Sequence, residues 1–116
     1  MQLDYLSEDC SAIWVTVPAI EDARLIAKTL VEEKLAACVS IIPEIISTYR
    51  WQGKVEEYSE VKLLVKTKSN LFDEVANRVK KIHPATLPEI ISLKIEQTTE
   101  DYQAWLLNET KEPNDE

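Results

Sequence analysis

Residues 38–67 have the sequence CVSIIPEIISTYRW-QG-KVEEYSEVKLLVKT, two long runs separated by Gln52 and Gly53. Both runs are rich in β-branched and aromatic residues, which favour strands, and the second alternates apolar with charged positions. Gly53 is the only glycine of the chain and suits the two-residue turn of a hairpin, where positive φ angles are needed. The stretch therefore predicts an antiparallel hairpin with arms 38–51 and 54–67.

Further elements are predicted on both sides of the hairpin from apolar periodicity and helix-capping residues. They are a strand over 12–17, a helix over 21–34, a helix from Leu71 or Phe72 to Ile82 capped by Ser69 or Asn70, a strand over 89–95, and a short helix that includes Tyr102, Trp105 and Leu106. The order βαββαβ predicts an α+β, ferredoxin-like antiparallel sheet with both long helices on one face. The short helix is an extra C-terminal element.

Length and composition indicate one domain over residues 1–116. The chain has 116 residues, of which 45% are hydrophobic, so a single core can form without disulfide or metal support. Residues 1–10 are acidic, and residues 111–116 are polar and interrupted by a proline. We expect both of these ends to be flexible.

Charge and cysteine content limit the kinds of partner. The formal net charge of −8 would repel a phosphate backbone, which disfavours nucleic acid as a partner. The N-terminus lacks the basic and apolar regions of a signal peptide, and no stretch has the apolar length of a membrane span. The chain has only two cysteines, Cys10 and Cys38, and lacks the character of a small secreted domain, so we expect reduced thiols and not a disulfide. These features predict a cytoplasmic protein with no membrane or nucleic-acid partner.

The predicted hairpin is too long to be covered by its own subunit. At about 3.3 Å per residue its arms extend about 45 Å, whereas the second helix, at about 1.5 Å per residue, spans only about 18 Å. Antiparallel register around Gln52-Gly53 places Tyr49, Trp51 and Tyr58 on one face of the uncovered part. An exposed aromatic ribbon favours a partner subunit, and strand pairing between copies in a closed ring would cover both the edge and the rings. The alternative is a hairpin that folds back over its own sheet.

A series of short motifs also runs along the chain in a fixed order: Leu35-Ala36-Ala37-Cys38, Ile41-Ile42-Pro43, Tyr49, Trp51-x-Gly53-Lys54, Glu60-Val61, Lys66-Thr67, His83-Pro84 and Pro88-Glu89. Over about residues 13–107, their order and spacing resemble the CutA family, also called divalent-cation tolerance proteins. The resemblance implies a homotrimer of ferredoxin-like subunits whose long hairpins pair across the interfaces, with Tyr49, Trp51, Gly53 and Tyr58 in those interfaces. It also implies a role in tolerance of copper and other divalent ions.

The chain departs from the family pattern near its proposed ligands. Ala85-Thr86 stands where many relatives have Tyr-Glu after His-Pro. Val15 and Ile82 occupy the places of a cysteine and a histidine among the copper ligands proposed in some bacterial relatives. Only His83 matches, and one imidazole without a converging thiolate or second histidine is a poor copper site.

Four polar side chains are candidates for a ligand site, each with an ordinary structural alternative. His83 is either a metal ligand or a helix-terminal residue favoured by the dipole, and Cys38 is either a soft ligand or an inert buried thiol. Glu60 and Lys66 lie on one side of the third strand and form either an interfacial polar cleft or a solvated face. A divalent metal such as copper is expected at subunit interfaces near His83, and no cofactor is required.

Catalytic patterns are missing from the sequence: it has no nucleophile elbow, glycine-rich phosphate loop, HExxH or CxxC. Our first hypothesis is therefore a non-enzymatic homotrimer associated with divalent-cation tolerance. The alternative is a trimeric scaffold or sensing module that resembles other ferredoxin-like signalling trimers. Such a module would bind a small anionic ligand through Lys62, Lys66 and Arg50.

Overall fold

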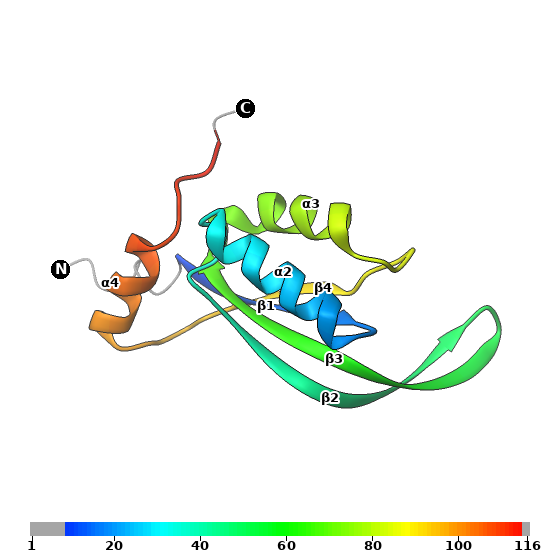
Figure 1. Ribbon diagram of the computed structural model, residues 1–116. Coiled ribbons are helices and arrows are strands. Elements are labelled where there is room, and N and C mark those ends of the chain that lie inside the picture. Colours follow the sequence, from blue (N-terminus) through cyan, green and yellow to red (C-terminus); the bar gives the residue numbers. More distant parts are fainter. Residues whose placement is uncertain (1–8, 115–116) are drawn as a thin grey trace.

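The computed structural model describes residues 9–114 of the chain. Its elements follow one another as β1 (Cys10–Val17), α2 (Ile20–Glu32), β2 (Cys38–Trp51), β3 (Lys54–Lys68), a 3-10 turn η1 (Ser69–Leu71), α3 (Phe72–Ile82), β4 (Ile90–Lys94) and α4 (Glu100–Asn108). This order confirms the predicted α+β, ferredoxin-like βαββαβ arrangement with an extra C-terminal helix. Figure 1 shows α2 and α3 side by side on one face of the sheet.

The main core lies between that face of the sheet and the two helices. Within the described residues the strand order is β2-β3-β1-β4, and all neighbouring strands are antiparallel. Val15 pairs with Leu63 and Ile13 with Val65, and all four side chains are fully buried. The helices contribute Ala23, Ile26 and Leu30 from α2 and Val75 and Val79 from α3. Apolar side chains at alternate strand positions and at helix positions spaced i, i+3/i+4 thus pack together in one layer.

The bounds of α3 agree with the prediction, but its cap does not. Ser69 and Asn70 lie in the 3-10 turn, α3 begins at Phe72, and its N-cap residue Leu71 makes no side-chain cap hydrogen bond. Ser69 Oγ lies 2.6 Å from Ser11 Oγ in β1. This hydroxyl pair joins the helix entrance to the sheet, a long-range contact that local sequence does not reveal.

The predicted flexibility around Cys10 is wrong for the described residues. Cys10 is the first residue of β1, pairs with Lys68 and is 0% exposed. Its carbonyl accepts the Ile95 N–H (3.0 Å), and its side chain packs with Leu106 of α4. The C-terminal helix folds back over this strand end, which orders it. The rest of the predicted N-terminal flexible segment, residues 1–8, lies outside the described residues.

The C-terminal segment is also ordered as far as the structure describes it. Lys111 donates its backbone N–H to Lys34 O (2.9 Å), and Asn114 donates its backbone N–H to Glu74 Oε2 (2.8 Å). These contacts fix residues 111–114, which were predicted to be flexible, and residues 115–116 lie outside the described part. This stretch is polar, and it is held by ion pairs and backbone hydrogen bonds to distant elements instead of by apolar packing.

The hairpin projects away from the helices. Trp51 pairs with Lys54, Tyr49 with Glu56 and Tyr58 with Ser47, the register expected from a Gln52-Gly53 turn. Figure 1 shows the turn end of β2 and β3 extending beyond α2 and α3, so the hairpin does not fold back over its own sheet. The described chain measures 52 × 25 × 25 Å. The two turn residues have positive φ angles, 51° and 82°, as a two-residue hairpin turn requires.

One irregularity divides the hairpin into two parts. Ile42 pairs with Lys62 and Ile45 with Glu60, so β2 has one residue more than β3 between these pairs. Such a bulge increases local twist and bends the strand. It lies at Pro43 and Glu44, where proline supplies no backbone donor to the ladder. The turn-proximal ribbon therefore leaves the sheet at an angle set by this bulge.

Candidate functional site

The projecting ribbon exposes an aromatic face. Tyr49, Trp51 and Tyr58 are 40%, 41% and 49% exposed, and the ring centroids of the two tyrosines lie 5.9 Å apart. Tyr58 Oη donates to Glu56 Oε1 (3.3 Å), and the charge of Glu56 raises the pKa of the Tyr58 phenol. Gly53 lies at the tip, with open space where a Cβ would be. The structure thus brings together the three aromatic residues predicted to share a face.

The opposite face of the ribbon is apolar as well. Ile46 is 68% exposed and Val55 is 66% exposed, and both alternate with the aromatic positions along their strands. A ribbon that exposes large apolar side chains on both faces is an unusual surface for a lone soluble chain.

The sheet continues this surface on the side that faces away from α2 and α3. Trp14 pairs with Leu64 on β3 and Ile91 on β4, and Leu93 pairs with Ala12, which places these side chains on one face. Ile91 and Leu93 are about half exposed. We call this surface, defined by Trp14, Leu64, Ile91 and Leu93, the open face. Alternate residues of β3 connect it to the aromatic face of the hairpin.

A polar cluster borders the open face near the end of α3. Lys62 Nζ lies 5.3 Å from the Trp14 ring centroid and 3.2 Å from Glu89 Oε2. Thr16 Oγ1 donates to the other carboxylate oxygen of Glu89 (3.0 Å). Glu89 thus links β1 and β3 through two side chains. The sequence assigned no ligand role to Glu89 or Thr16, although Thr16 lies opposite Lys62 once the register is known.

His83 is buried beside this cluster, and both of its ring nitrogens are engaged. The backbone N–H of Ala85 donates to Nδ1 (3.0 Å), so Nδ1 is the acceptor and Nε2 carries the proton. Nε2 therefore donates to Thr16 O, 2.8 Å away. The imidazole joins the end of α3 to β1. A metal ion on Nδ1 would have to displace the Ala85 hydrogen bond.

The other predicted ligands do not converge on His83. Cys38 is half-buried and pairs with Lys66. Thr16, the partner of His83, pairs instead with Lys62, which lies four residues before Lys66 on β3. Among residues 9–114 no group of three or more His, Cys, Asp or Glu side chains could hold a metal ion. The described part of one subunit therefore provides fewer than the three His, Cys, Asp or Glu ligands of a metal group at His83.

Glu60 and Lys66 share a face of β3 but do not meet. Lys66 Nζ lies 3.5 Å from Ser40 Oγ, and Glu60 pairs with Ile45 on the ribbon side of the bulge. Lys62 lies between them on the same face and is bound to Glu89. Arg50 pairs with Val55, which alternates onto the opposite face from Lys62 and Lys66. The three cations proposed for an anionic ligand are thus divided between two faces.

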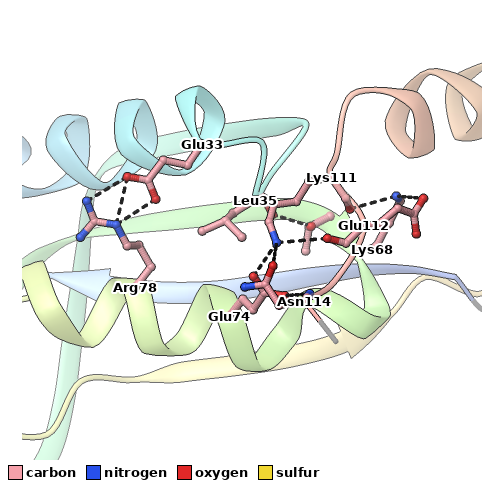
Figure 2. Close-up of polar contacts among 9 residues, drawn as sticks. Glu33, Leu35, Lys68, Glu74, Arg78, Lys111, Glu112 and Asn114 are labelled. Atoms are coloured by element: carbon pink, nitrogen blue, oxygen red, sulfur yellow. Dashed lines mark hydrogen bonds and ion pairs between the residues drawn. The ribbon is translucent and has the colours of Figure 1, made fainter. Parts of the chain in front are cut away.

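A pocket lies at the other end of the helical layer, and Figure 2 shows the polar contacts among several of its lining residues. Its volume is about 360 Å³, and it is lined by Glu33, Leu35, Glu74, Asn77, Arg78, Lys81, Lys111 and Asn114. Arg78 forms two short hydrogen bonds to Glu33, 2.9 Å from each donor nitrogen, and this contact lowers the pKa of Glu33. Lys111 Nζ lies 2.6 Å from Glu74 Oε1 and lowers the pKa of Glu74. Arg78 and Lys111 are thus already paired with carboxylates.

Known proteins share both the sequence and the fold. The "Divalent-cation tolerance protein CutA" of Thermus thermophilus is 51% identical over 98 residues, which cover 84% of this chain and 95% of that protein. The human "Protein CutA" is 40% identical over 111 residues, 96% of this chain and 62% of that protein.

Solved structures agree in fold. The divalent cation tolerance protein (Cut A1) of Thermus thermophilus superposes with a TM-score of 0.86 at 49% identity, covering 88% of this chain and 99% of that one. CutA1 from Oryza sativa superposes with a TM-score of 0.89 at 39% identity, covering 93% and 99%. The family model described as "CutA1 divalent ion tolerance protein" matches residues 11–109. The chain belongs to the CutA1 divalent ion tolerance protein family.

Proposed function

We propose that this chain acts as a non-enzymatic homotrimer in the tolerance of divalent cations, copper among them. Family membership supports the link to divalent cations, because the T. thermophilus relative is named for that property. The projecting hairpin supports self-association, because both of its faces expose apolar side chains that a second copy would cover. The exposed apolar side chains of the hairpin are the main observation in favour of the proposed homotrimer.

The free strand edges favour assembly by strand pairing. Among the described strands, β2 and β4 are the outer members of the sheet, so each presents one unpaired backbone edge. Pairing of a β2 edge with a different edge on the next copy is a heterologous contact, which either closes into a ring or grows without limit. A ring of three covers the hairpins and leaves no open end.

Growth under metal stress tests the proposed role. In a bacterium that lacks its own CutA1 protein and is sensitive to copper, this chain is expected to restore growth at inhibitory copper concentrations. A Tyr49→Ser/Trp51→Ser variant is expected to restore growth less, because its hairpin loses the rings that a neighbouring copy would bury. Equal growth with the parent chain and an empty vector would contradict the tolerance role.

A metal site at His83 requires ligands from a neighbouring copy. The imidazole is one donor, and copper needs further nitrogen or sulfur ligands for affinity. Calorimetric copper titration of the assembled protein is expected to lose its tightest site in His83→Ala and keep it in Cys38→Ser, with Cys10→Ser as the common background. The same affinity and stoichiometry in His83→Ala would exclude His83 as the ligand.

A cytoplasmic location remains part of this proposal. None of the helices in residues 9–114 is long and apolar enough to cross a membrane. Related proteins carry names for different compartments: the Arabidopsis thaliana relative is called chloroplastic, and the structure from Archaeoglobus fulgidus is called periplasmic. Fractionation of native cells with an antibody against this chain tests the location directly.

The alternative module for a small anionic ligand has weaker support. Lys62 is bound to Glu89, and Arg50 lies on the other face of the ribbon from Lys66. A thermal-shift screen of nucleotides and carboxylate metabolites distinguishes this alternative, because a ligand of the folded protein raises its melting temperature by mass action. We expect no shift with these compounds, and a saturable shift abolished by Lys66→Met would favour the alternative.

A further inference from the structure

The pocket beside α3 is built by three segments that are distant in the sequence. Its lining comes from residues 33–35 at the end of α2, from α3, and from residues 111–114. The α3 members follow i, i+3, i+4, i+7 spacing and so share one face of the helix: Glu74, Asn77, Arg78 and Lys81. The pocket volume of about 360 Å³ lies at the lower end of the range for small-molecule sites, about 300–1,000 Å³. The pocket therefore has room for a small metabolite.

Two ion pairs hold the walls of this pocket in position. Glu33, the C-cap residue of α2, accepts hydrogen bonds from Nε and Nη2 of Arg78, each 2.9 Å long. Glu74 accepts from Lys111 Nζ (2.6 Å) and from the Asn114 N–H (2.8 Å), as Figure 2 shows. Side chains that are already fixed in this way lose little conformational freedom when a ligand binds. The pocket is therefore preorganised.

The groups that remain free in the pocket are mainly hydrogen-bond donors. Arg78 uses Nε and Nη2 on Glu33, whereas its Nη1 has no hydrogen-bond partner among residues 9–114. The side chains of Lys81 and Asn77 make no hydrogen bond or ion pair within the described chain. Asn114 Oδ1 accepts from Lys111 Nζ, which leaves the amide nitrogen of Asn114 free to donate. A ligand that fits these groups must supply acceptors.

The charge of the pocket favours an anionic ligand. Three cations and two carboxylates line it, although the whole chain has a net charge of −8. Both carboxylates are paired, and within residues 9–114 Lys81 is the lining cation that has no carboxylate partner. Arg78 and Lys81 are i, i+3 neighbours on α3, so one anionic group can reach both. A phosphate monoester suits them, because it carries about two negative charges and three acceptor oxygens.

The rest of the lining limits the organic part of such a ligand. None of the described lining residues is aromatic, so a nucleotide base would have no ring to stack on. The side-chain amides of Asn77 and Asn114 suit hydroxyl groups. Leu35, which is 5% exposed, offers only a small apolar contact. These residues favour an organic part that carries hydroxyl groups and no base.

We propose that this pocket binds a small sugar phosphate or polyol phosphate. Arg78 Nη1 and Lys81 Nζ donate to the phosphate group, and the amides of Asn77 and Asn114 bind the hydroxyl groups of the organic part. The pocket lies on the helical side of the sheet, whereas the open face lies on the other side. This site therefore requires neither the proposed homotrimer nor a metal ion.

Calorimetric titration of the full chain with glucose 6-phosphate and with glycerol 3-phosphate tests the site, with a chelator present to remove metal ions. Saturable binding of at least one ester is expected, and no binding of glucose or glycerol, which lack the phosphate. Lys81→Met is expected to raise the dissociation constant about tenfold, because it removes a charged hydrogen-bond donor. Asn77→Leu is expected to weaken binding of the ester and to leave binding of inorganic phosphate unchanged.

Lys80 provides a matched control. It precedes Lys81 on α3 and is exposed, but it does not line the pocket. Lys80→Met removes the same charge and is expected to keep the dissociation constant within about twofold of the parent, because salt screens exposed charges. Equal weakening in Lys80→Met and Lys81→Met would indicate unspecific attraction and overturn the proposal. Absence of saturable binding with both esters would overturn it as well.

Amide chemical shifts of isotope-labelled protein locate the bound ester. The amides of residues 33–35, 77–81 and 111–114 are expected to shift during the titration. Shifts centred on Lys62 and Lys66 instead would place the ester on the other face of the sheet and contradict the proposal. The mass of the assembly, measured on the same samples, is expected to stay that of the parent in Lys81→Met. A failure of this site and a failure of the proposed homotrimer therefore give different results.

Discussion

Tyr49 and Tyr58 lie diagonally across the hairpin, with ring centroids 5.9 Å apart and ring planes inclined by 38°. They are not register partners, since Tyr49 pairs with Glu56 and Tyr58 with Ser47. The right-handed twist of a two-stranded ribbon brings such diagonal neighbours together. The pair therefore forms one preorganised aromatic surface on the projecting ribbon, and the proposed assembly depends on its burial by another copy.

Removal of this pair is expected to weaken self-association. Tyr49→Ser/Tyr58→Ser should raise the dissociation constant of the trimer at least about a hundredfold, because each buried interface aromatic contributes on the order of 2 kcal/mol. Sedimentation velocity over a dilution series measures this change. Leu25→Ser on α2, which removes a half-exposed apolar side chain and leaves the aromatic face of the hairpin intact, serves as the control and should sediment like the parent.

Gly53 is expected to be replaceable only at the cost of backbone strain. Its φ of +82° disfavours a side chain, although an added Cβ would meet no atom within 4 Å. Gly53→Val should destabilise the hairpin by about 1–2 kcal/mol, whereas Gly53→Asn should lose less, because asparagine tolerates positive φ. Urea unfolding at fixed protein concentration measures both. Equal losses in the two variants would indicate that the tip makes side-chain contacts in the assembly.

His83 is expected to stabilise the fold whether or not it binds metal. His83→Ala leaves Thr16 O and the Ala85 N–H without their imidazole partner in a buried site, which should cost about 1–3 kcal/mol. Urea unfolding in the presence of a chelator isolates this structural contribution. Parental stability in the variant would mean that water replaces both hydrogen bonds.

The two carboxylates at the helix ends are expected to make stability fall in acid. Contacts with Arg78 and Lys111 lower the pKa values of Glu33 and Glu74 from the ordinary 4.5. Because a lowered folded-state pKa means that the unfolded chain binds protons first, this contribution is complete above pH 4.5 and is lost as the pH falls through the folded values. Urea midpoints between about pH 6 and pH 3 should fall less steeply in Glu33→Gln/Glu74→Gln than in the parent. Identical slopes would mean that other carboxylates control acid unfolding.

The sequence predicts most of the fold because its signals are local. Alternation along residues 54–67 and the Gln52-Gly53 turn determine the hairpin register, and helical periodicity identifies α2 and α3. The predictions of flexible chain ends failed because the order of these ends depends on distant partners. Cys10 packs with Leu106, and residues 111–114 are held by Glu74, 37 residues before Lys111.

The candidate site was predicted in part for a similar physical reason. The exposed aromatic face follows from strand alternation, so Tyr49, Trp51 and Tyr58 could be placed together from sequence. Whether His83 binds a ligand or supports the fold depends on the positions of Ala85 N and Thr16 O around its ring, and these follow from the loop after α3. The role of Glu89 likewise requires the pairing of β1 with β3, which brings Thr16 and Lys62 to its carboxylate.

Native mass spectrometry of the unmodified protein at low micromolar concentration measures the proposed assembly. A homotrimer should give one dominant species with three times the 13.3 kDa mass of the chain, converting to single chains only on further dilution or with loss of the hairpin aromatics. A folded species of 13.3 kDa as the dominant form at that concentration would contradict it.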